Sequence, residues 1–412
     1  MGVRQSVEDQ YDAFPYPQRR PDDERTRLIS GELGELALVN HIYWSGQRAF
    51  DDQFRVLDAG CGTGDAAIFM AEQLRGSGAR VTGVDLSEAS LAVARARAEV
   101  RGLDNVDFEQ GALEDLPQQG LGPFDWIVSF GVLHHLESPQ AGLNALREVC
   151  KPDGGIGVML YGRWGRVPVY QLQELFRLLA PGDLSAADRI KIVQATLPRL
   201  NPAHWATIGS ESWQGELQDS GDAALVDLFL HAQDRAYTVA ETYELAESCG
   251  MRVARPLFPI LYQPRTYLPD ADIDPLDERE RQSVGELLHG RISTHQLLLA
   301  HAGHELPSPH PPDDESAVPA WVRFPATDQI SDELRSTGKA AVPLPDGYME
   351  VRVNDVGRAL VDGVDGRKPL GEVLTQAASD LPGVERPQLE EEWLRAFASM
   401  YRFNLMVMDP AG

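Results

Sequence analysis

Phe54 to Leu86 read FRVLDAGCGTGDAAIFMAEQLRGSGARVTGVDL, and this stretch decides the fold. The apolar runs at its two ends, 54–59 and 80–86, predict buried strands, and the segment between them carries the apolar period of a helix. A strand, a helix and a second strand within about 30 residues form the unit of a parallel sheet, because parallel strands need a crossover connection. We therefore predict an α/β domain built outward from this stretch.

The turn after the first strand reads Asp58-Ala59-Gly60-Cys61-Gly62-Thr63-Gly64. Glycine lets the backbone bend sharply and approach a ligand closely, and the following helix presents free N–H groups. Asp85 ends the second strand, where a carboxylate can accept both hydroxyls of an adenosine ribose. No Gly-Lys-Ser/Thr follows the turn, which excludes a Walker loop, whereas NAD and S-adenosylmethionine both satisfy the pattern up to this point.

Further strands are predicted at NVDFEQ (105–110), FDWIVSF (124–130) and GIGVMLY (155–161), and VARPLFPILY (253–262) could supply one more. Gly131-Val132-Leu133-His134-His135-Leu136 follows FDWIVSF, and LREVCKPDGG (146–155) follows in turn. In this order the motifs resemble class I S-adenosylmethionine-dependent methyltransferases over residues 54–161. The resemblance implies S-adenosyl-L-methionine as cofactor and a Rossmann-like seven-stranded methyltransferase sheet whose last strand is antiparallel.

The resemblance also implies roles for single residues in binding the cofactor. The methionine portion is assigned to the turn, the ribose to Asp85, and the adenine to Leu86 and to the turn after the third strand. The complete set expected to bind the cofactor is Tyr11, Asp58, Gly60, Cys61, Gly62, Asp85, Leu86, Gly111, Ala112, Leu113, Phe130, Gly131 and Val132. Many relatives carry Asp where this chain has Ala112, so Glu114, Asp115 or a backbone carbonyl is expected to replace it at the adenine amino group.

The N-terminal QYDAFPYP (10–17) resembles the entrance segment of a bacterial methyltransferase group that includes the rickettsial protein lysine methyltransferases. Proline stiffens such a segment, so we interpret it as a lid with Tyr11 and Tyr16 beside the sulfonium. The alternative is an extended arm packed on the surface. Asn40, His41 and Trp44 are candidates for the same wall, and a buried amphipathic helix explains them nearly as well.

Methyl transfer from a sulfonium needs no nucleophile from the protein, so positioning of the acceptor is the main requirement. A lysine acceptor must be neutral, which costs on the order of 4–5 kcal/mol at neutral pH because its pKa is normally near 10.4. His135 and His134, just after the fourth strand, are the candidate catalytic residues together with Tyr16. The alternative role for the two histidines is in the wall or in hydrogen bonding.

The chain divides into six predicted parts. A lid (1–50), a cofactor-binding core (51–162), a helical insert for the substrate (163–236), the completion of the core with following helices (237–305), a Pro-rich linker (306–320) and a small winged-helix-like C-terminal domain (321–412) follow one another. Polar and aromatic residues concentrate at the two ends of the insert. Arg166, Asp234, Arg235 and Tyr237 are the predicted substrate residues, with a buried salt bridge that supports a loop as the alternative.

Composition restricts the partners. Lys and Arg number 37 against 63 Asp and Glu, a net charge of -26, which disfavours nucleic acid and suits a basic polypeptide. No stretch has the length and apolarity of a membrane span or a secretory signal, and the cysteines are solitary, so we expect a cytoplasmic protein without disulfides. A homodimer is possible.

Five histidines lie close together in the sequence: His289, His295, His301, His304 and His310. No cysteine or regularly spaced carboxylate completes a ligand set there, so we predict no metal and place these histidines on solvent-facing helix.

The sequence thus predicts a methyltransferase for a protein or peptide side chain, with an amine as the preferred acceptor. Two alternatives remain open: methylation of a small metabolite or natural product, and a non-catalytic adaptor that keeps the fold.

Overall fold

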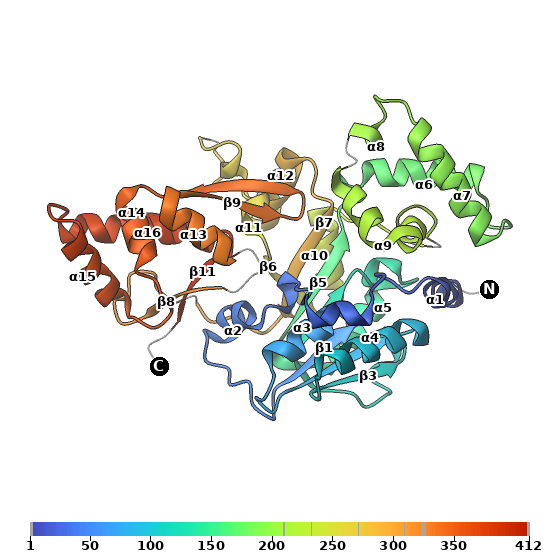
Figure 1. The fold of residues 1–412 in the computed structure, drawn as a ribbon, viewed down its shortest axis with the longest axis horizontal. Helices are drawn as coiled ribbons and strands as arrows, with labels where there is room; N and C mark the ends of the chain where they lie inside the picture. The colour runs from blue at the N-terminus through green and yellow to red at the C-terminus, as the bar shows by residue number, and fades with distance from the viewer. Residues whose placement is uncertain are drawn as a thin grey trace.

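A seven-stranded sheet in the order β3-β2-β1-β4-β5-β7-β6 forms the centre of the molecule (Figure 1). The structure is a computed structural model that describes residues 3–208, 211–231, 233–270, 272–308, 310–322 and 327–409. The strands are β1 Arg55–Ala59, β2 Arg80–Asp85, β3 Val106–Gln110, β4 Phe124–Phe130, β5 Cys150–Tyr161, β6 Met251–Pro256 and β7 Thr294–His301. Strand β7 is antiparallel to both of its neighbours, which confirms the predicted fold class.

The sheet is buried on both faces. Val56 and Trp126 belong to one apolar core, and the next residues along the chain, Leu57 and Ile127, belong to a second. Since successive side chains of a strand point to opposite faces, each face carries its own core under helices. The covering elements of this domain are α3 Asp65–Gln73, α4 Glu88–Arg101, η3 Leu113–Asp115, η4 Leu133–His135, α5 Pro139–Val149 and α10 Val239–Ser248, where η denotes a short 3-10 helix.

The last part of the sheet differs from the prediction. The candidate strand at 253–262 is the strand β6 followed by a short helix. Of the five histidines placed on a solvent-facing helix, His289 ends a helix, whereas His295 and His301 lie in the seventh strand. His295 lies in β7 and is fully buried. An apolar run that is buried on both faces has no amphipathic period, which is why its strand character was missed. The elements beside β6 and β7 are α11 Pro259–Tyr262, η6 Pro264–Thr266 and α12 Glu278–His289.

The insert between β5 and α10 is helical, as its sequence predicts. It consists of α6 Val167–Leu179, α7 Ala186–Thr196, η5 Leu197–Arg199, α8 Trp205–Ile208 and α9 Glu211–Phe229. These helices have a small core of their own around Phe176, Val193 and Leu228. Helix α9 is interrupted at Gly221, whose φ of 50° is outside the helical range.

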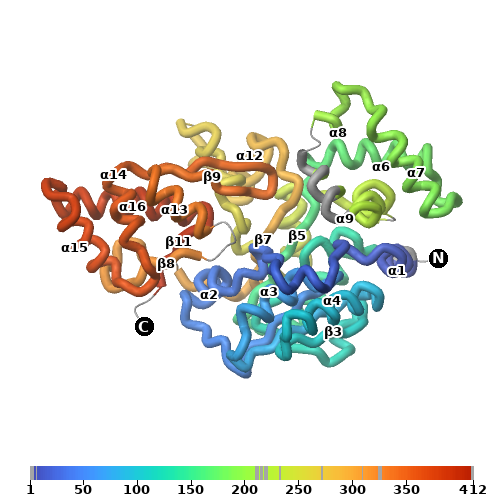
Figure 2. The backbone as a smooth tube through the Cα atoms, viewed as in Figure 1, coloured from blue at the N-terminus to red at the C-terminus, as the bar shows by residue number. Residues whose placement is uncertain are grey.

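The N-terminal segment runs along the outside of the sheet domain. Figure 2 shows it in blue, passing from α1 across α4 and α3 to α2. Its elements are α1 Val3–Ala13, η1 Pro21–Arg25, η2 Glu32–Gly34 and α2 Leu36–Trp44. Helix α1 packs on α4, and η1 packs on the same helix.

A small C-terminal unit lies on the opposite side of the molecule from the insert (Figure 1). It contains β8 Val318–Trp321, α13 Thr327–Thr337, β9 Lys339–Leu344, β10 Gly347–Arg352, α14 Asp355–Asp362, α15 Leu370–Asp380, α16 Arg386–Tyr401 and β11 Met406–Asp409. β9 and β10 form an antiparallel hairpin, and β8 pairs with β11. Strand β8 begins inside the predicted linker, and Arg255 of β6 donates to Asn404 Oδ1 at 2.6 Å. The winged-helix assignment stays a prediction. No described helix combines the length and apolarity needed to span a membrane.

Candidate functional site

The glycine-rich turn is fixed to both the sheet and the helix that follows it. The N–H groups of Gly60 and Cys61 both donate to Val84 O of β2, at 2.7 and 3.0 Å. Asp58 Oδ2 accepts the N–H of Ala67 at 2.8 Å, so this carboxylate satisfies the first turn of α3. Burial raises the pKa of Asp58 to about 7. The role of Asp58 in this structure is thus to hold the glycine-rich turn against the start of α3.

Asp85 stands at the end of β2 with both carboxylate oxygens directed at backbone N–H groups. Its Oδ2 accepts from Gly62 at 2.8 Å, and its Oδ1 accepts from Ser87 at 2.9 Å. Burial raises the pKa of Asp85, and the two backbone N–H bonds act in the opposite direction. The turn and the acid, 23 residues apart in the sequence, are therefore in direct contact. A carboxylate in this position can accept hydrogen bonds from the hydroxyls of an adenosine ribose.

The remaining residues predicted for the cofactor surround this pair. Gly111 donates its N–H to Asp85 O, and Ala112 and Leu113 after it are buried. Val132 packs against the turn so closely that a Cβ on Gly60 would lie 2.3 Å from its Cγ2. Phe130 at the end of β4 is 46% exposed, a large apolar side chain facing open space at the same sheet edge. Leu86 is half-buried, and Gly131 donates to Met159 O.

Of the expected replacements for the missing adenine acid, Asp115 has another partner. Arg4 of α1 donates to Asp115 Oδ2 at 2.8 Å. Asp115 therefore ties the N-terminal helix to the sheet domain, and Glu114 and the backbone stay as candidates for the adenine amino group.

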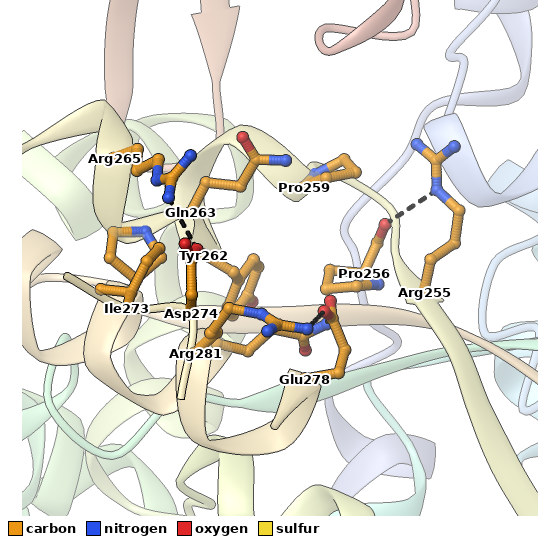
Figure 3. Close-up of a pocket in the computed structure, with 12 residues that line it drawn as sticks. Arg255, Pro256, Pro259, Tyr262, Gln263, Arg265, Ile273, Asp274, Glu278 and Arg281 are labelled. Atoms are coloured by element: carbon orange, nitrogen blue, oxygen red, sulfur yellow. Dashed lines mark hydrogen bonds and ion pairs between the residues drawn. The ribbon is translucent and has the colours of Figure 1, made fainter. Parts of the chain in front are cut away.

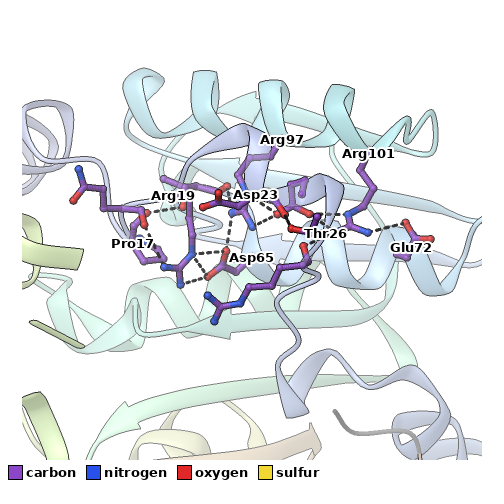
Figure 4. Close-up of polar contacts among 12 residues, drawn as sticks. Pro17, Arg19, Asp23, Thr26, Asp65, Glu72, Arg97 and Arg101 are labelled. Carbon is purple, nitrogen blue, oxygen red and sulfur yellow. Dashed lines mark hydrogen bonds and ion pairs between the residues drawn. The ribbon is translucent and has the colours of Figure 1, made fainter. Parts of the chain in front are cut away.

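The N-terminal segment lies on the glycine-rich turn. Thr63 Oγ1 donates to Pro17 O at 2.8 Å, and a Cβ on Gly62 would lie 2.5 Å from Tyr16 O. Gly62 also has a φ of 51°, so both its conformation and its surroundings require glycine. Figure 4 shows the next contact, in which Arg19 pairs with Asp65 at the start of α3 at 2.8 Å. The predicted lid thus crosses the mouth of the turn; its role as a lid remains a proposal.

A buried ion-pair network fastens the same segment further along (Figure 4). Glu24 of η1 pairs with Arg97 and Arg101 of α4, each at 2.6 Å. Arg97 is 1% exposed and also pairs with Asp65. Because charges this deeply buried require partners, η1 is held firmly on the sheet domain.

A second group of polar residues gathers where β4 ends, and most of them come from outside the cofactor motifs. Tyr11 of α1 donates to Asp227 Oδ1 of α9 at 2.8 Å, and Tyr161 at the end of β5 donates to Asp227 Oδ2 at 3.3 Å. His231 Nε2 lies 3.3 Å from the Tyr11 hydroxyl, and the His231 ring stacks on His135 with centroids 3.9 Å apart. We call Tyr11, His135, Asp227 and His231 the acceptor-side cluster.

Burial keeps the histidines of this region neutral. It lowers the pKa of His135 to about 4 and that of His231 to about 3, and it lowers the pKa of His134 as well. His134 stacks on Tyr161 at 3.7 Å, and neither of its ring nitrogens has a hydrogen-bond partner among the described residues. These rings are therefore unprotonated at neutral pH, and their lowered pKa values make them weak bases.

The predicted residues divide between the two groups. Tyr11, predicted beside the cofactor, has its hydroxyl on the acceptor side. Arg166 joins that side as well, with its guanidinium 3.4 Å above the Tyr161 ring. The other predicted substrate residues have structural partners: Asp234 accepts from Gln173, Arg235 lies over the Tyr237 ring and pairs with Glu241 at 3.6 Å, and Tyr237 is buried.

Sequence reasoning missed Asp227 and His231. Asp227 is a single acid inside the apolar run ALVDLFL (224–230), and it is 2% exposed. A lone charge within a run that must be buried was the available signal, because buried carboxylates need partners. Asn40, His41 and Trp44 have partners outside both groups: Asn40 caps the turn at Arg48, His41 lies edge-on to Tyr401 of the C-terminal unit, and Trp44 donates to Asp153 O.

The acceptor-side cluster also presents the donor set of a cation site. One ligand atom from each of His135, Asp227 and His231 lies within 4.8 Å of the others. Two imidazoles and a carboxylate are a ligand set that zinc uses. The sequence analysis predicted no metal.

A separate cavity of about 420 Å³ opens between β6, α11 and α12 (Figure 3). Its charged lining residues are largely paired with each other, Arg265 with Asp274 at 2.7 Å and Arg281 with Glu278 at 3.0 Å. None of the predicted site residues lines it.

The comparisons with known proteins agree with the geometry of the first group. Residues 50–217 match the family model described as a methyltransferase domain. An uncharacterized protein of Synechococcus sp. is 31% identical over 253 residues, which are 60% of this chain and 59% of that protein. The ubiquinone biosynthesis O-methyltransferase of Maricaulis maris is 35% identical over 117 residues, 28% of this chain and 44% of that enzyme. The chain thus spans about half the length of these curated relatives.

Two solved structures of PKMT2 from Rickettsia typhi resemble nearly the whole chain. The one in complex with AdoHcy has a TM-score of 0.62 at 14% identity and covers 94% of this chain and 76% of that chain. The other has a TM-score of 0.64 at 13% identity, with 92% and 77% covered. At this identity the likeness is one of fold. Residues 50–217 match the model of a methyltransferase domain, and the resemblance to the class I methyltransferases is confirmed.

Proposed function

We propose that this chain, whose residues 50–217 match the model of a methyltransferase domain, transfers a methyl group from S-adenosylmethionine to an amine of a protein or peptide side chain. The observation that carries the methyltransferase part is the contact between Asp85 and the glycine-rich turn. A carboxylate fixed at the end of β2, beside the glycine-rich turn and the N-terminus of α3, fits the ribose and the methionine portion of an adenosyl ligand.

The bound cofactor would supply a methyl group already activated by a positive sulfur. The chain's own task is then to hold the acceptor in line and to exclude water, and correct orientation is worth about 7–11 kcal/mol in favourable cases. The N-terminal segment over the turn serves the exclusion of water, since Tyr16 and Pro17 cover Gly62 and Thr63.

Two observations support a side-chain amine as the acceptor. The acceptor-side cluster combines a buried carboxylate, which attracts a cation, with histidines that stay neutral and so do not repel one. The fold likeness to the rickettsial PKMT2 also extends over the insert and the C-terminal unit, since it covers 94% of the chain. The likeness to the O-methyltransferases covers 117 residues, a length for which the sheet domain alone would account.

The test has two stages. Calorimetry of the full chain with S-adenosylmethionine and with its demethylated product should show binding of both, and no binding at millimolar ligand would remove the proposal. Incubation of a cell lysate with the full chain and methyl-tritiated cofactor should then label protein, and acid hydrolysis should release methylated lysine.

Methylation of a small metabolite is the second candidate, favoured by the named activity of the curated relative from Maricaulis maris. It is distinguished by using a lysate filtrate free of macromolecules as the source of acceptor. Label that appears in a small compound separated by chromatography from the cofactor would replace the polypeptide acceptor while leaving the methyltransferase assignment intact.

A further inference from the structure

We propose that the C-terminal unit completes the acceptor side of the site, because Asp346 at the tip of its β9–β10 hairpin fixes the loop that holds Arg166 against Tyr161. This inference rests on the proposed function and deepens it, since it adds a positioning residue for the same reaction. Figure 1 shows the hairpin extending from the C-terminal unit toward α12 and β7. The loop in question is residues 162–166, between β5 and α6, and we call it the β5–α6 loop.

The first contact joins the hairpin to the start of β7. Asp346 lies in the turn between β9 and β10, and its Oδ2 accepts the N–H of Ser293 at 3.1 Å. Its Oδ1 accepts the hydroxyl of the same residue. Burial raises the pKa of Asp346, and the two bonds from Ser293 act in the opposite direction. The hairpin tip and the residue before β7 are therefore tied together by both oxygens of one carboxylate.

The second contact joins the residues before β7 to the β5–α6 loop. The N–H of Gly162 donates to Ser293 O at 2.7 Å, and the N–H of Gly165 donates to Ile292 O at 3.1 Å. A Cβ on Gly162 would lie 2.2 Å from Ile292 O, and a Cβ on Gly165 would lie 2.4 Å from the carbonyl carbon of Ile292. The two backbones are thus so close that only glycine fits at both positions. A shift of Ser293 must move the loop as well.

The third contact joins the β5–α6 loop to the acceptor side. Arg166 ends the loop, donates its N–H to Gly162 O at 3.2 Å, and places its guanidinium 3.4 Å above the ring of Tyr161. Arg166 is 7% exposed, so this cation–π contact is largely desolvated. The Tyr161 hydroxyl donates to Asp227, the carboxylate that the proposed function assigns to the acceptor's cation. The position of the loop therefore affects how Tyr161 meets Asp227.

The C-terminal unit also has a second attachment to the sheet domain, away from the hairpin tip. Arg255 of β6 donates to Asn404 Oδ1 at 2.6 Å, and Asn404 Nδ2 donates to Leu257 O. Tyr401 of the same unit lies edge-on to His41 of α2. These contacts hold the C-terminal unit in place when the bonds of Asp346 are lost. Removal of the Asp346 carboxylate should therefore loosen the β5–α6 loop without releasing the unit.

The two sides of the site should respond differently to this change. Asp85 is held by the N–H groups of Gly62 and Ser87, and Asp346 has no part in those contacts. On the acceptor side, a displacement of about 1 Å by a residue far from the chemistry can lower the rate about 100-fold. The rate of transfer is therefore expected to depend on Asp346, whereas cofactor affinity is not. Asp346 and Ser293 are positioning residues.

Hydrogen exchange of the full chain tests the contact without an acceptor. In Asp346→Ala, the peptide that contains the N–H groups of Gly162 and Gly165 should exchange at least about tenfold faster than in the wild type. Asp346→Asn should match the wild type, because its carbonyl oxygen can accept the N–H of Ser293 and its amide can donate to the hydroxyl. Glu350→Ala, which removes an exposed acid from the same hairpin, is the matched control. Unchanged exchange in Asp346→Ala would overturn the proposal.

Protein labelling with methyl-tritiated cofactor tests the consequence for the reaction. Asp346→Ala should lower the rate of lysate protein labelling at least about tenfold, and calorimetry should show cofactor affinity within about twofold of the wild type. Asp346→Asn and Glu350→Ala should label at the wild-type rate. A normal rate in spite of a loosened loop, or an Asn variant as slow as the Ala variant, would contradict the proposal. A parallel loss of cofactor affinity would also contradict it, because the effect would then not be confined to the acceptor side.

Folding and cofactor binding are checked separately. If urea unfolding shows that Asp346→Ala does not fold, Ser293→Ala replaces it, since this substitution removes one of the two bonds to the carboxylate. Ser293→Ala should show the same changes at a smaller size, and wild-type exchange and rate in that variant would overturn the proposal. Failure of the wild type to bind cofactor would overturn the proposed function instead, and exchange at Gly162 and Gly165 would still decide whether Asp346 holds the loop.

Discussion

The cofactor side and the acceptor side of this site differ in how far apart in the sequence their contacting residues lie. On the cofactor side the decisive contacts are made by two acids, Asp58 and Asp85, with backbone N–H groups of a single strand–helix–strand unit. On the acceptor side they are made by side chains separated by 216 residues in the case of Tyr11 and Asp227. The first is a property of local chain geometry, and the second exists only in the assembled tertiary structure.

The N-terminal segment is what the two sides share. It covers the glycine-rich turn at Tyr16 and Pro17, and it supplies Tyr11 to the acceptor-side cluster. A substitution on one side should therefore change either cofactor binding or acceptor activation. A substitution that loosens the N-terminal segment from the sheet domain should change both.

The largest effect is expected at the buried ion pairs that hold η1 on α4. Glu24→Ala would leave the buried Arg97 with less than its full complement of partners, and breaking a buried ion pair from one side costs about 3–5 kcal/mol. Urea unfolding should show this loss in the free energy of unfolding. Asp22→Ala, an exposed acid in the same short helix, should change it by less than about 0.5 kcal/mol. Equal effects of the two substitutions would mean that η1 is not what holds the segment.

The second effect should be confined to the cofactor side. Asp85→Ala removes the acceptor for two ribose hydroxyls, and hydrogen bonds to a charged group are worth about 1.5–3 kcal/mol each. We expect calorimetry to show cofactor binding weakened at least about 100-fold, the equivalent of about 3 kcal/mol. Glu109→Ala, an exposed acid on the neighbouring strand β3, is the matched control. An unchanged affinity would show that the ribose partner is elsewhere.

This difference in construction explains what could be predicted from the sequence. The turn, Asp85 and six strands or candidate strands were predictable because each depends on residues close together in the chain. Strand β7 was not, since a run buried on both faces has no diagnostic period, and its His295 was placed on a solvent-facing helix. Asp227 was missed for the same reason that Tyr11 was placed beside the cofactor: the direction of a side chain on a helix depends on what the helix packs against.

The third effect is a pH dependence that belongs to the acceptor side. The pKa of His135 is about 4 in the folded protein against an ordinary value of 6.5, so the unfolded chain binds more protons between these values. Stability should therefore fall as the pH is lowered through this window, by about 2 kcal/mol between pH 6.5 and 5 for this one group at 1.36 kcal/mol per pKa unit. Denaturant unfolding at a series of pH values measures the slope.

The slope assigned to His135 is the difference between the wild type and His135→Gln, because other groups contribute. Asp58 acts with the opposite sign: its pKa is raised to about 7, so its contribution to stability is lost as the pH rises from its ordinary value through 7. A His135→Gln variant whose pH dependence equals that of the wild type would show that His135 is hydrated and titrates normally, and that the acceptor side is not buried.

The smallest expected effect is the sharpest test of where the boundary between the two sides lies. Tyr11→Phe keeps the ring and removes a hydroxyl that joins Asp227 to His231. Stability should fall by about 1–2 kcal/mol, since a buried carboxylate oxygen loses its donor. Cofactor affinity should stay within about twofold, because the hydroxyl is directed at the insert and away from Asp85.

Calorimetry and urea unfolding of Tyr11→Phe, beside Tyr348→Phe at a 77% exposed position of the C-terminal unit, give both values. A tenfold loss of cofactor affinity with unchanged stability would return Tyr11 to the cofactor side, where the sequence had placed it. The docked N-terminal helix would then be a wall of the sulfonium pocket. The two sides of the site would form one cooperative unit, instead of two units that are joined only by the N-terminal segment.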